Sequence, residues 1–469
     1  MIGRQWRHTA ATAPVINPFT GEKLADVCQA GQEDAEHAMT AAVKAAAAMR
    51  RLPAHARSKA LATISQGLAD RHEAFARSIT AEADKPISDA RREVGRAVQT
   101  LRRASETKRL GGEVIPMDIT PGADSHLGLT RRFPIGPVLG ITPFNFPLNL
   151  VAHKVAPCLA AGNPMILKPA PQTPLTALML AELMLETDLP DGAFSVVPCD
   201  NAVAECLVTD PRIKLLSFTG SAAVGWMLKA KAGKKRVALE LGGNAGVIIE
   251  PDADLEWAAQ RCVAGGFVYS GQTCISVQRL FVHDSVLVPF LGHLLARVGA
   301  LTMGNPTDEA TVIGPLINEA AAERVDEWVK EAIAAGARVK AGGKRTGSLV
   351  EATVLTEVTP SMKVSRQEVF GPLVTISPYK QFGEAIEALN HSDFGLQSSV
   401  FTRDIEKIFR AYRDIEAGAV LANEIPTFRA DHMPYGGIKD SGIGREGVRY
   451  TIEEMTEPKL LVLNLQQAG

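Results

Sequence analysis

Apolar residues recur every three or four positions through the first quarter of the chain, which is the spacing of one helix face. This pattern predicts helices over Asp34 to Arg51, Ala54 to Ala83 and Ile87 to Lys108. Leu52-Pro53 and Lys85-Pro86 separate the three stretches. Proline stops a helix because it has no N–H to donate and disfavours the helical conformation in the preceding residue. The chain therefore opens with a helical region.

After Gly111-Gly112 the pattern changes to short apolar runs separated by stretches of helical length. Ser125 to Phe133 alternates like a strand, and a second series of strand-like runs starts at Gly246. Strands that alternate with helices of about 10–15 residues are typical of βαβ units with a parallel sheet. We therefore predict an α/β fold. The strand-like runs of the first series are Val138 to Thr142, Pro164 to Lys168, Phe194 to Pro198, Ile213 to Phe218 and Arg236 to Glu240.

Size, composition and charge fit a large globular protein and exclude several classes. The chain has 469 residues, 46% hydrophobic and 22% charged, so it can bury a core without disulfides or metals. A net charge of −2 and 5% aromatic residues predict no nucleic-acid surface. No apolar stretch approaches the roughly 20 residues of a membrane span. With no signal-peptide pattern either, we expect a cytoplasmic protein that binds no membrane.

The six cysteines form no CxxC pair and have no histidine at zinc-ligand spacing, which predicts free thiols and no metal. Most free cysteines are inert core residues. Cys274 differs because it ends the segment Ser270-Gly271-Gln272-Thr273-Cys274, whose small residues let backbone amides and a planar cofactor approach closely. A lone cysteine beside a glycine turn is still more often structural than reactive.

Three further segments can supply groups that act together with a thiol. Glu240 ends an apolar strand and can face the ligand crevice of a parallel sheet, although a surface glutamate before a turn is as common. Asn145, in a turn fixed by two prolines, can donate to an oxyanion, although such residues more often cap turns. Ser221 opens a helix after a strand, where free amides can bind phosphate, although a plain N-cap is the alternative.

Together these groups fit the oxidation of an aldehyde through a thioester. A thiolate adds to the carbonyl carbon, a hydride leaves to nicotinamide, and a base-activated water releases the acid. Each segment alone has a structural explanation, so the chemistry depends on all of them occurring together.

With these residues in view, the chain resembles the aldehyde dehydrogenase superfamily over nearly its whole length, from Ile16 to Lys459. The separation between Glu240 and Cys274, 34 positions (274 − 240), also suits the family. The resemblance implies a Rossmann-like coenzyme domain, an α/β catalytic domain and a small β oligomerisation arm. The motifs that carry it, in the family's order, are PFNFP, LKPA, FTGS, LELGGN, GQTC, EVFGP and PYGGIKDSGIGREG.

The resemblance also implies roles for single residues. Cys274 is the nucleophile, Glu240 is the general base that activates water, and Asn145 forms the oxyanion hole with the backbone amide of Cys274. NAD(P)+ is the implied cofactor. Lys168 holds its adenosine ribose and Glu368 its nicotinamide ribose. The implied cofactor-binding residues are Thr142, Pro143, Phe144, Lys168, Gly220, Ser221, Gly225, Leu241, Glu368 and Phe370.

Three regions follow from the same resemblance. The coenzyme domain is expected in residues 1–112 and 135–241, the catalytic domain in 242–450, and oligomerisation strands in 115–134 and 451–469. The apolar tail from Thr456 to Leu465 would add to a neighbouring subunit's sheet, which explains an apolar strand at a terminus. We therefore expect a homodimer or a homotetramer.

Two departures from the family pattern bear on specificity. Pro171 stands where NAD-selective members often carry a glutamate, so nothing there repels a 2′-phosphate, and we expect NADP+ to be tolerated or preferred. Thr273 stands where many phosphate-directed members carry an arginine. Arg102, Arg103 and Arg429 remain as candidate anion binders for a small semialdehyde or hydroxyaldehyde. A solvated helix face is the alternative for the first two.

Two other functions compete with this interpretation. A CoA-acylating semialdehyde dehydrogenase passes the acyl group to a thiol, and members of that branch usually lack the glutamate that stands here as Glu240. A catalytically inactive structural or binding member should have lost Cys274, Glu240 or Asn145, and all three are present. The sequence therefore favours hydrolysis of the thioester to a carboxylic acid.

Overall fold

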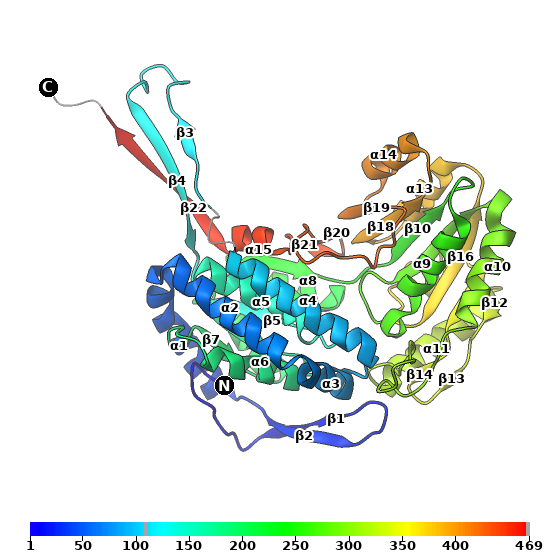
Figure 1. Cartoon of the computed structure of the whole chain (residues 1–469), viewed down its shortest axis with the longest axis horizontal. Helices are drawn as coiled ribbons and strands as arrows, with labels where there is room; N and C mark the ends of the chain where they lie inside the picture. The colour runs from blue at the N-terminus through cyan, green and yellow to red at the C-terminus, as the bar shows by residue number, and fades with distance from the viewer. Residues whose placement is uncertain (107–110, 466–469) are drawn as a thin grey trace.

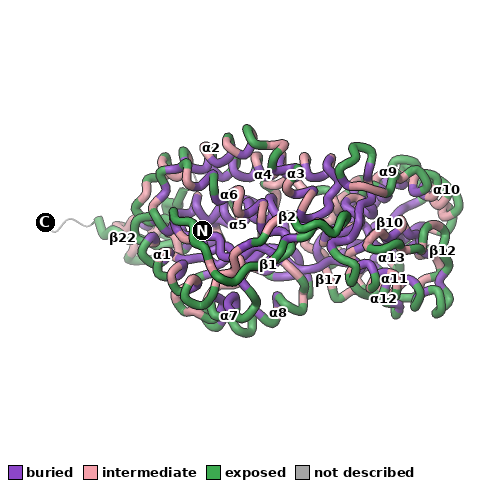
Figure 2. Tube along the Cα trace, turned by 90° about the horizontal axis from the view of Figure 1, so that it is seen from below, coloured by how far each residue is buried: buried purple, intermediate pink, exposed green. Residues whose placement is uncertain are grey.

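The computed structural model describes residues 1–106 and 111–465. Two α/β units, each built on one sheet, form the main body, and a narrow three-stranded arm projects from it (Figure 1). Buried segments run through the middle of both units, whereas the end of the arm is exposed (Figure 2). The predicted α/β fold class is confirmed.

The first sheet has the strand order β21-β9-β8-β5-β6-β7, and only the β21–β9 pair is antiparallel. From β5 the chain continues to β6 and β7 on one side. It then returns to β8 on the other side of β5 and continues to β9. Ligands bind at the carboxyl ends of strands where the order reverses, here between β5 and β8. The strands are β5 (Val138–Ile141), β6 (Met165–Lys168), β7 (Phe194–Val196), β8 (Leu215–Thr219), β9 (Arg236–Glu240) and β21 (Gly442–Ile443).

Helices bury both faces of this sheet, because successive strand residues point to opposite sides. Val138 of β5 belongs to one apolar cluster with helices α2 to α6, and Leu139 belongs to a second with α1, α7 and α8. A hairpin, β1 (Thr12–Ile16) with β2 (Lys23–Cys28), precedes them. The helices are α1 (Gln32–Arg51), α2 (Ala54–Asp70), α3 (His72–Ala83), α4 (Ile87–Glu106), α5 (Asn149–Ala161), α6 (Leu175–Leu185), α7 (Asn201–Thr209) and α8 (Ala222–Lys231).

The second sheet has the order β12-β15-β16-β11-β10-β18-β19, parallel except for β12. Its strands are β10 (Ala245–Ile249), β11 (Val277–His283), β12 (Arg338–Ala341), β15 (Thr353–Thr356), β16 (Leu373–Tyr379), β18 (Gln397–Phe401) and β19 (Ala419–Ala422). The helices of this unit are α9 (Leu255–Phe267), α10 (Leu287–Val298), α11 (Glu319–Ala334), α12 (Lys363–Arg366), α13 (Phe382–Asn390) and α14 (Ile405–Asp414). Two short hairpins, β13 (Arg345–Thr346) with β14 (Leu349–Val350) and β17 (Phe394–Gly395) with β20 (Ile438–Lys439), complete it.

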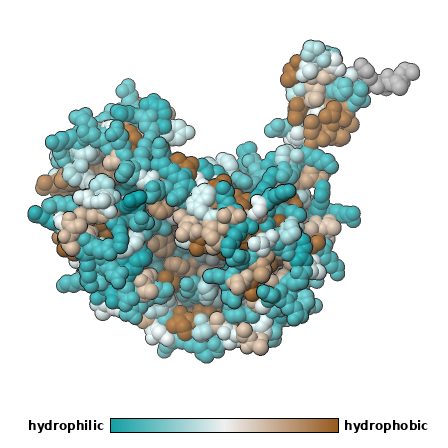
Figure 3. All heavy atoms as spheres, turned by 180° about the vertical axis from the view of Figure 1, so that it is seen from behind, coloured by the Kyte–Doolittle hydropathy of each residue, from teal (hydrophilic) through white to brown (hydrophobic). Residues whose placement is uncertain are grey.

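The arm is an antiparallel sheet in which β4 lies between β22 and β3. Its strands are β3 (Val114–Pro116), β4 (His126–Pro134) and β22 (Thr456–Asn464), and α15 (Val448–Glu454) leads into β22. Apolar side chains gather on the arm in the space-filling view (Figure 3). Exposed ones on and after β22 are Leu460, Leu461, Val462, Leu463 and Leu465.

Three details differ from the sequence-based expectations. The apolar run from Ala54 to Ala83 is two helices, because the chain breaks at Arg71. The N-terminal hairpin was not predicted. Residues 442–443, expected with the catalytic domain, pair instead with β9 of the first sheet. The expected third helix is confirmed to Glu106, and its last two positions, 107 and 108, lie outside the described residues. None of the described helices is both long and apolar enough to cross a membrane.

Helix α3 ends at Asp84, whose carboxyl group is buried without a hydrogen-bond partner among the described residues. Asp84 adopts the left-handed conformation (φ 50°) and is fully buried. Burial raises the pKa of Asp84 to about 8. An aspartate in the unfolded chain titrates near about 3.9. Between these two pH values the carboxyl group is protonated in the folded protein and ionised in the unfolded chain. The free energy of unfolding therefore falls as the pH rises through this range.

We therefore expect Asp84→Asn to stabilise the protein increasingly with pH. Asparagine keeps the shape, tolerates the left-handed conformation and carries no charge. The gain in unfolding free energy should grow by about 1.4 kcal/mol per pH unit between roughly pH 5 and 8. Denaturant unfolding at several pH values measures it, with the exposed Asp188 changed to Asn as the control. Equal, pH-independent effects of both substitutions would contradict this expectation.

Candidate active site

Cys274 follows a tight turn in which three consecutive residues adopt positive φ. Tyr269, Ser270 and Gly271 have φ of 48°, 54° and 71°. This conformation is unfavourable for residues other than glycine, so the surroundings must hold it. The Tyr269 hydroxyl donates to the carbonyl of Ala83 at 2.9 Å, and the Ser270 hydroxyl donates to the carbonyl of Gly314 at 2.7 Å. The first of these bonds ties the turn to the end of α3.

Two neighbouring segments complete the surroundings of the cysteine. The side-chain amide of Asn145 is buried and donates to the carbonyl of Gln272 at 2.9 Å. Gly243 follows β9 and lies so close that a Cβ there would collide with the carbonyl oxygen of Cys274. The glycine pair after Glu240 thus lets the two chains meet, and it brings Asn145, Cys274 and Glu240 to one place.

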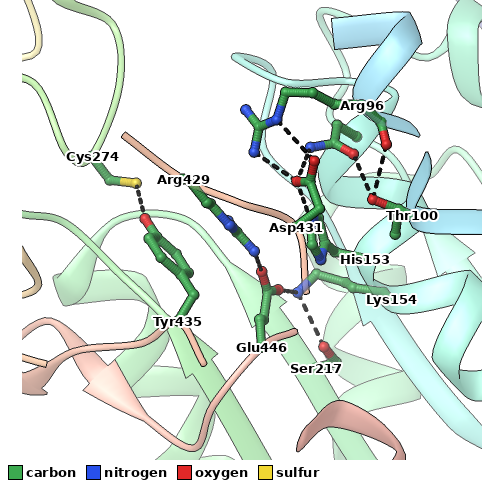
Figure 4. Close-up of polar contacts among 11 residues, drawn as sticks. Arg96, Thr100, His153, Lys154, Ser217, Cys274, Arg429, Asp431, Tyr435 and Glu446 are labelled. Atoms are coloured by element: carbon green, nitrogen blue, oxygen red, sulfur yellow. Dashed lines mark hydrogen bonds and ion pairs between the residues drawn. The ribbon is translucent and has the colours of Figure 1, made fainter. Parts of the chain in front are cut away.

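The thiol of Cys274 contacts a tyrosine that sequence reasoning did not single out. The Sγ atom of Cys274 lies 3.0 Å from the hydroxyl of Tyr435, which is buried (Figure 4). Burial raises the pKa of Cys274 to about 12, although the hydrogen bond to Tyr435 and the nearby Arg429 oppose the shift. The resting side chain is therefore a thiol, which must lose its proton before it can attack.

Two buried glutamates near the cysteine titrate in opposite directions. Burial, and then the negative charge of Glu446, raise the pKa of Glu240 well above its usual value. Burial also opposes ionisation of Glu446, but Lys154 and Arg429 outweigh it and lower the pKa of Glu446 to about 2. Glu446 accepts from Arg429 at 2.9 Å and from Lys154 at 3.3 Å (Figure 4). Oε2 of Glu240 has no hydrogen-bond partner among the described residues, so Glu240 can exchange a proton.

A cavity of about 700 Å³ opens at the carboxyl ends of β5, β6, β8 and β9. It is lined by every residue expected to bind the coenzyme except Gly225, which lies beneath Leu241. A Cβ at Gly225 would collide with Leu241. The N-cap Ser221 makes no side-chain cap, so the first amides of α8 remain available for a phosphate. The rings of Phe144 and Phe370 pack edge to face, with their centroids 5.9 Å apart. The residues present thus fit a dinucleotide.

A second cavity of about 380 Å³ lies on the other side of Cys274, against helix α4. Cys274 lines both cavities. Five cations face the second cavity against two carboxylates, Asp89 and Glu93. Asp431, Glu424 and Glu446, which pair with three of the cations, do not line it. Lys85 pairs with Glu93 and Arg92 with Asp89 within the lining, so the excess of positive charge on this wall comes from Arg96, Arg261 and Arg429. The five cations are Lys85, Arg92, Arg96, Arg261 and Arg429.

The sequence-predicted anion binders are placed differently from the expectation. Arg102 and Arg103 do not line the cavity; both are exposed and pair with Glu106, so the solvated-face alternative describes them. Arg429 lines the cavity, but its side chain is only 5% exposed, bound to Glu446 and stacked on Tyr435. Arg96, which lies earlier on the same helix as Arg102 and Arg103, reaches the cavity instead.

Arg96 is held in place by a carboxylate behind it. Its Nη2 and Nε atoms donate to Asp431 at 2.7 and 3.2 Å, which leaves Nη1 without a hydrogen bond among the described residues. Asp431 also accepts from Asn149 and contacts His153 (Figure 4). One helical turn after Arg96, the Thr100 hydroxyl donates to the Arg96 carbonyl at 3.1 Å. The guanidinium therefore keeps one edge toward Asp431.

Sequence reasoning missed four residues of this site. Tyr435 and Glu446 stand in the PYGGIKDSGIGREG motif, which could have pointed to them. Arg96 and Lys154 have no comparable sequence signal, because each lies on a helix among other polar and apolar residues.

Comparison with known proteins agrees with this geometry. Residues 6–461 match the family model described as "Aldehyde dehydrogenase family". The chain is 44% identical to the 3-sulfolactaldehyde dehydrogenase of Priestia megaterium over 99% of its own length and 97% of that protein. It is similar to aldehyde dehydrogenase 21 from Physcomitrella patens in complex with the reaction product succinate, with a TM-score of 0.98, 43% identity and coverage of 100% and 98% of the two chains.

A second solved structure is the NADP-dependent glyceraldehyde-3-phosphate dehydrogenase from Bacillus halodurans C-125 complexed with NADP. Its TM-score is 0.97 and its identity 34%, and the match covers 99% of this chain and 98% of that one. The chain therefore belongs to the aldehyde dehydrogenase family. It is an NAD(P)+-dependent oxidoreductase that converts aldehydes to carboxylic acids.

Proposed function

We propose that this enzyme oxidises a short aldehyde with an anionic end group, using Cys274 as the nucleophile and NADP+ as the favoured coenzyme. The observation that carries the proposal is the position of Cys274 between two cavities. One has the lining expected for a dinucleotide, and the other is small and electropositive. A thiol placed between them can bond to the aldehyde carbon from one side while the coenzyme lies on the other.

In the first step the thiol of Cys274 gives its proton to a water molecule, and its sulfur bonds to the aldehyde carbon. The carbonyl π electrons move to the oxygen, which becomes an oxyanion. Asn145 can hold that oxyanion, because its amide has a second N–H besides the one that binds Gln272. The backbone amide of Cys274 is the second donor. A buried site strengthens both hydrogen bonds because little water competes for them.

The coenzyme supplies the oxidising step: when bound, it accepts a hydride from the carbon that carries the sulfur, and a thioester is left. The chain's part is to hold it there. Ser221 and the first amides of α8 suit the pyrophosphate, and Lys168 suits the adenosine ribose. Glu368 suits the nicotinamide ribose. It accepts from the Gly243 amide at 2.9 Å, which fixes its carboxylate beside the loop that meets Cys274.

Hydrolysis then needs a base that takes a proton from water, and Glu240 fits that role. Its raised pKa makes it a stronger base than an exposed glutamate once it is ionised. Water attacks the thioester carbon, the carbon–sulfur bond breaks, and the acid leaves. Glu446 stays ionised between Lys154 and Arg429, so its charge persists beside Glu240. A buried base next to the thioester favours water over CoA as the acyl acceptor.

The electropositive cavity supports an anionic substrate. Arg96 faces the cavity with Nη1 still able to donate, and the carboxylate that orients it lies behind the wall. A sulfonate or carboxylate accepts strong hydrogen bonds from a guanidinium. The three relatives described above each carry a short anionic molecule in their names: 3-sulfolactaldehyde, succinate and glyceraldehyde-3-phosphate. A cavity of this size suits a chain of a few carbons.

We expect Arg96→Gln to lower kcat/KM for 3-sulfolactaldehyde and succinate semialdehyde by about 10- to 100-fold, because it removes a charge-assisted hydrogen bond worth roughly 1.5–3 kcal/mol. The neutral lactaldehyde should change much less. Reduced-coenzyme absorbance measures all three reactions. Arg102→Gln, on the exposed face of the same helix, is the matched control and should change none of them. Equal losses for anionic and neutral aldehydes would show that Arg96 only supports the fold.

The coenzyme preference should depend on position 171. Pro171 lines the coenzyme cavity with Lys168, and the nearby Glu205 is paired with Lys231 at 2.7 Å. We expect Pro171→Glu to lower kcat/KM for NADP+ by about tenfold or more, which corresponds to at least ~1.4 kcal/mol of charge repulsion. NAD+ should be unaffected or improved. Pro171→Ala controls for the loss of proline. A wild-type enzyme that uses only NAD+ would refute the preference.

We propose that the arm joins subunits into a homodimer or homotetramer. β22 forms the edge of the arm sheet, and its apolar side chains are exposed. An unpaired apolar edge strand is a template for pairing with another chain. Removal of residues 457–469 should therefore give a monomer in light scattering, whereas removal of 466–469 alone should not. An intact chain that stays monomeric at micromolar concentration would exclude this role.

The state of the cysteines supports a reducing compartment. All six are free, although several are buried and none is paired across the fold. Free thiols persist where glutathione and thioredoxin keep them reduced. We therefore propose the cytoplasm as the location, and fractionation that places the enzyme in an oxidising compartment would overturn it.

A further inference from the structure

Tyr435 is buried beside the reactive sulfur and is fixed from several directions. Its backbone exchanges two hydrogen bonds with Glu446, one in each direction. The guanidinium of Arg429 lies 3.7 Å from its ring centroid, within cation–π range. Ile275, Leu396 and Met433 pack around the ring and the cysteine. The phenol therefore cannot swing away without disturbing a packed cluster.

The direction of the phenol is also fixed. Its hydroxyl lies 3.0 Å from Sγ of Cys274, and the two groups point toward each other (Figure 4). A hydroxyl can donate to a thiolate, whereas a thiolate has no proton to give back. The hydrogen bond between the two groups is therefore stronger when Cys274 is a thiolate than when it is a thiol. That difference stabilises the thiolate relative to the thiol.

We propose that Tyr435 is a catalytic hydrogen-bond donor that stabilises the thiolate of Cys274 and keeps it facing the aldehyde cavity, with Arg429 as the positioning residue behind it. Arg429 is thereby assigned a role other than the substrate binding expected from the sequence. The inference rests on the proposed role of Cys274 as the nucleophile.

Other charged groups around the sulfur cannot replace this donor. Glu368 faces Cys274 from the coenzyme side and Glu240 from the end of β9, and both oppose a negative charge on the sulfur. Arg429 favours the charge, but its hydrogen bond goes to Glu446. Burial itself opposes the thiolate. Tyr435 is the group that both favours the thiolate and touches it.

The test is alkylation of the free enzyme with iodoacetamide, which reacts with the thiolate and needs neither aldehyde nor coenzyme. Tyr435→Phe keeps the ring under Arg429 and removes the hydroxyl. We expect the rate constant for Cys274 at pH 8 to fall about tenfold, and the rate–pH profile to move up by roughly one unit. Peptide mass spectrometry follows each cysteine separately. The exposed Cys206 serves as an internal reference whose rate should not change.

A matched variant separates a local effect from the general loss of a buried phenol. Tyr379→Phe removes a hydroxyl that donates to the Ile249 carbonyl at 3.0 Å, at the far end of β11 from Cys274. It should leave the Cys274 profile unchanged. An equal or faster rate in Tyr435→Phe would overturn the proposal, and so would an equal shift in both variants.

A second measurement keeps the hydroxyl of Tyr435 in place and changes only its acidity. Replacing the five tyrosines with 3-fluorotyrosine makes the phenol more acidic and a stronger donor, so alkylation of Cys274 should become faster. An unchanged or slower rate would also overturn the proposal. If fluorination did not speed alkylation but aldehyde turnover stayed normal, the role of Tyr435 would fall and Cys274 would remain the proposed nucleophile. A Cys274→Ala variant with normal turnover would instead overturn the proposed function itself.

Discussion

The site depends on the turn at residues 269–271, where three consecutive residues hold a left-handed conformation. Such a turn is unfavourable on its own and persists because hydrogen bonds from Tyr269 and Ser270 hold it. One bond reaches the end of α3, and the other reaches the loop at Gly314. The turn therefore places Cys274 where both units supply groups. The glycine at 243 allows the chain after β9 to approach the same point.

Burial and two cations together decide the charges of the groups around the sulfur. It raises the pKa of Cys274 and Glu240, which favours their neutral forms, but two cations keep Glu446 ionised. Pairs of titratable groups whose environments push their pKa values apart often mark acid–base chemistry. Here Glu240 can take up and release a proton while Glu446 keeps its charge. In the function proposed above, the cavity against α4 binds the anionic end of the substrate, away from this proton chemistry.

Much of the fold could be predicted from the sequence, because local patterns determine it. The five parallel strands of the first sheet and helix α9 follow directly from apolar periodicity and helix-length spacing. The break at Arg71 could not be predicted, since neither proline nor glycine marks it. Cys274, Glu240 and Asn145 stand in recognisable motifs, and the structure brings them together. Arg96 and Lys154 could not be found, because their roles depend on partners that lie 335 and 292 positions away in the sequence.

The central claim is that Cys274 forms a thioester that Glu240 helps water to hydrolyse. The most direct measurement mixes a Glu240→Gln variant with aldehyde and NADP+ and follows reduced coenzyme together with the mass of the Cys274 peptide. The account predicts about one equivalent of reduced coenzyme per subunit, then turnover slowed by roughly 100-fold or more, and an acyl group on Cys274. Steady turnover at the wild-type rate, or an acyl group on another residue, would contradict it.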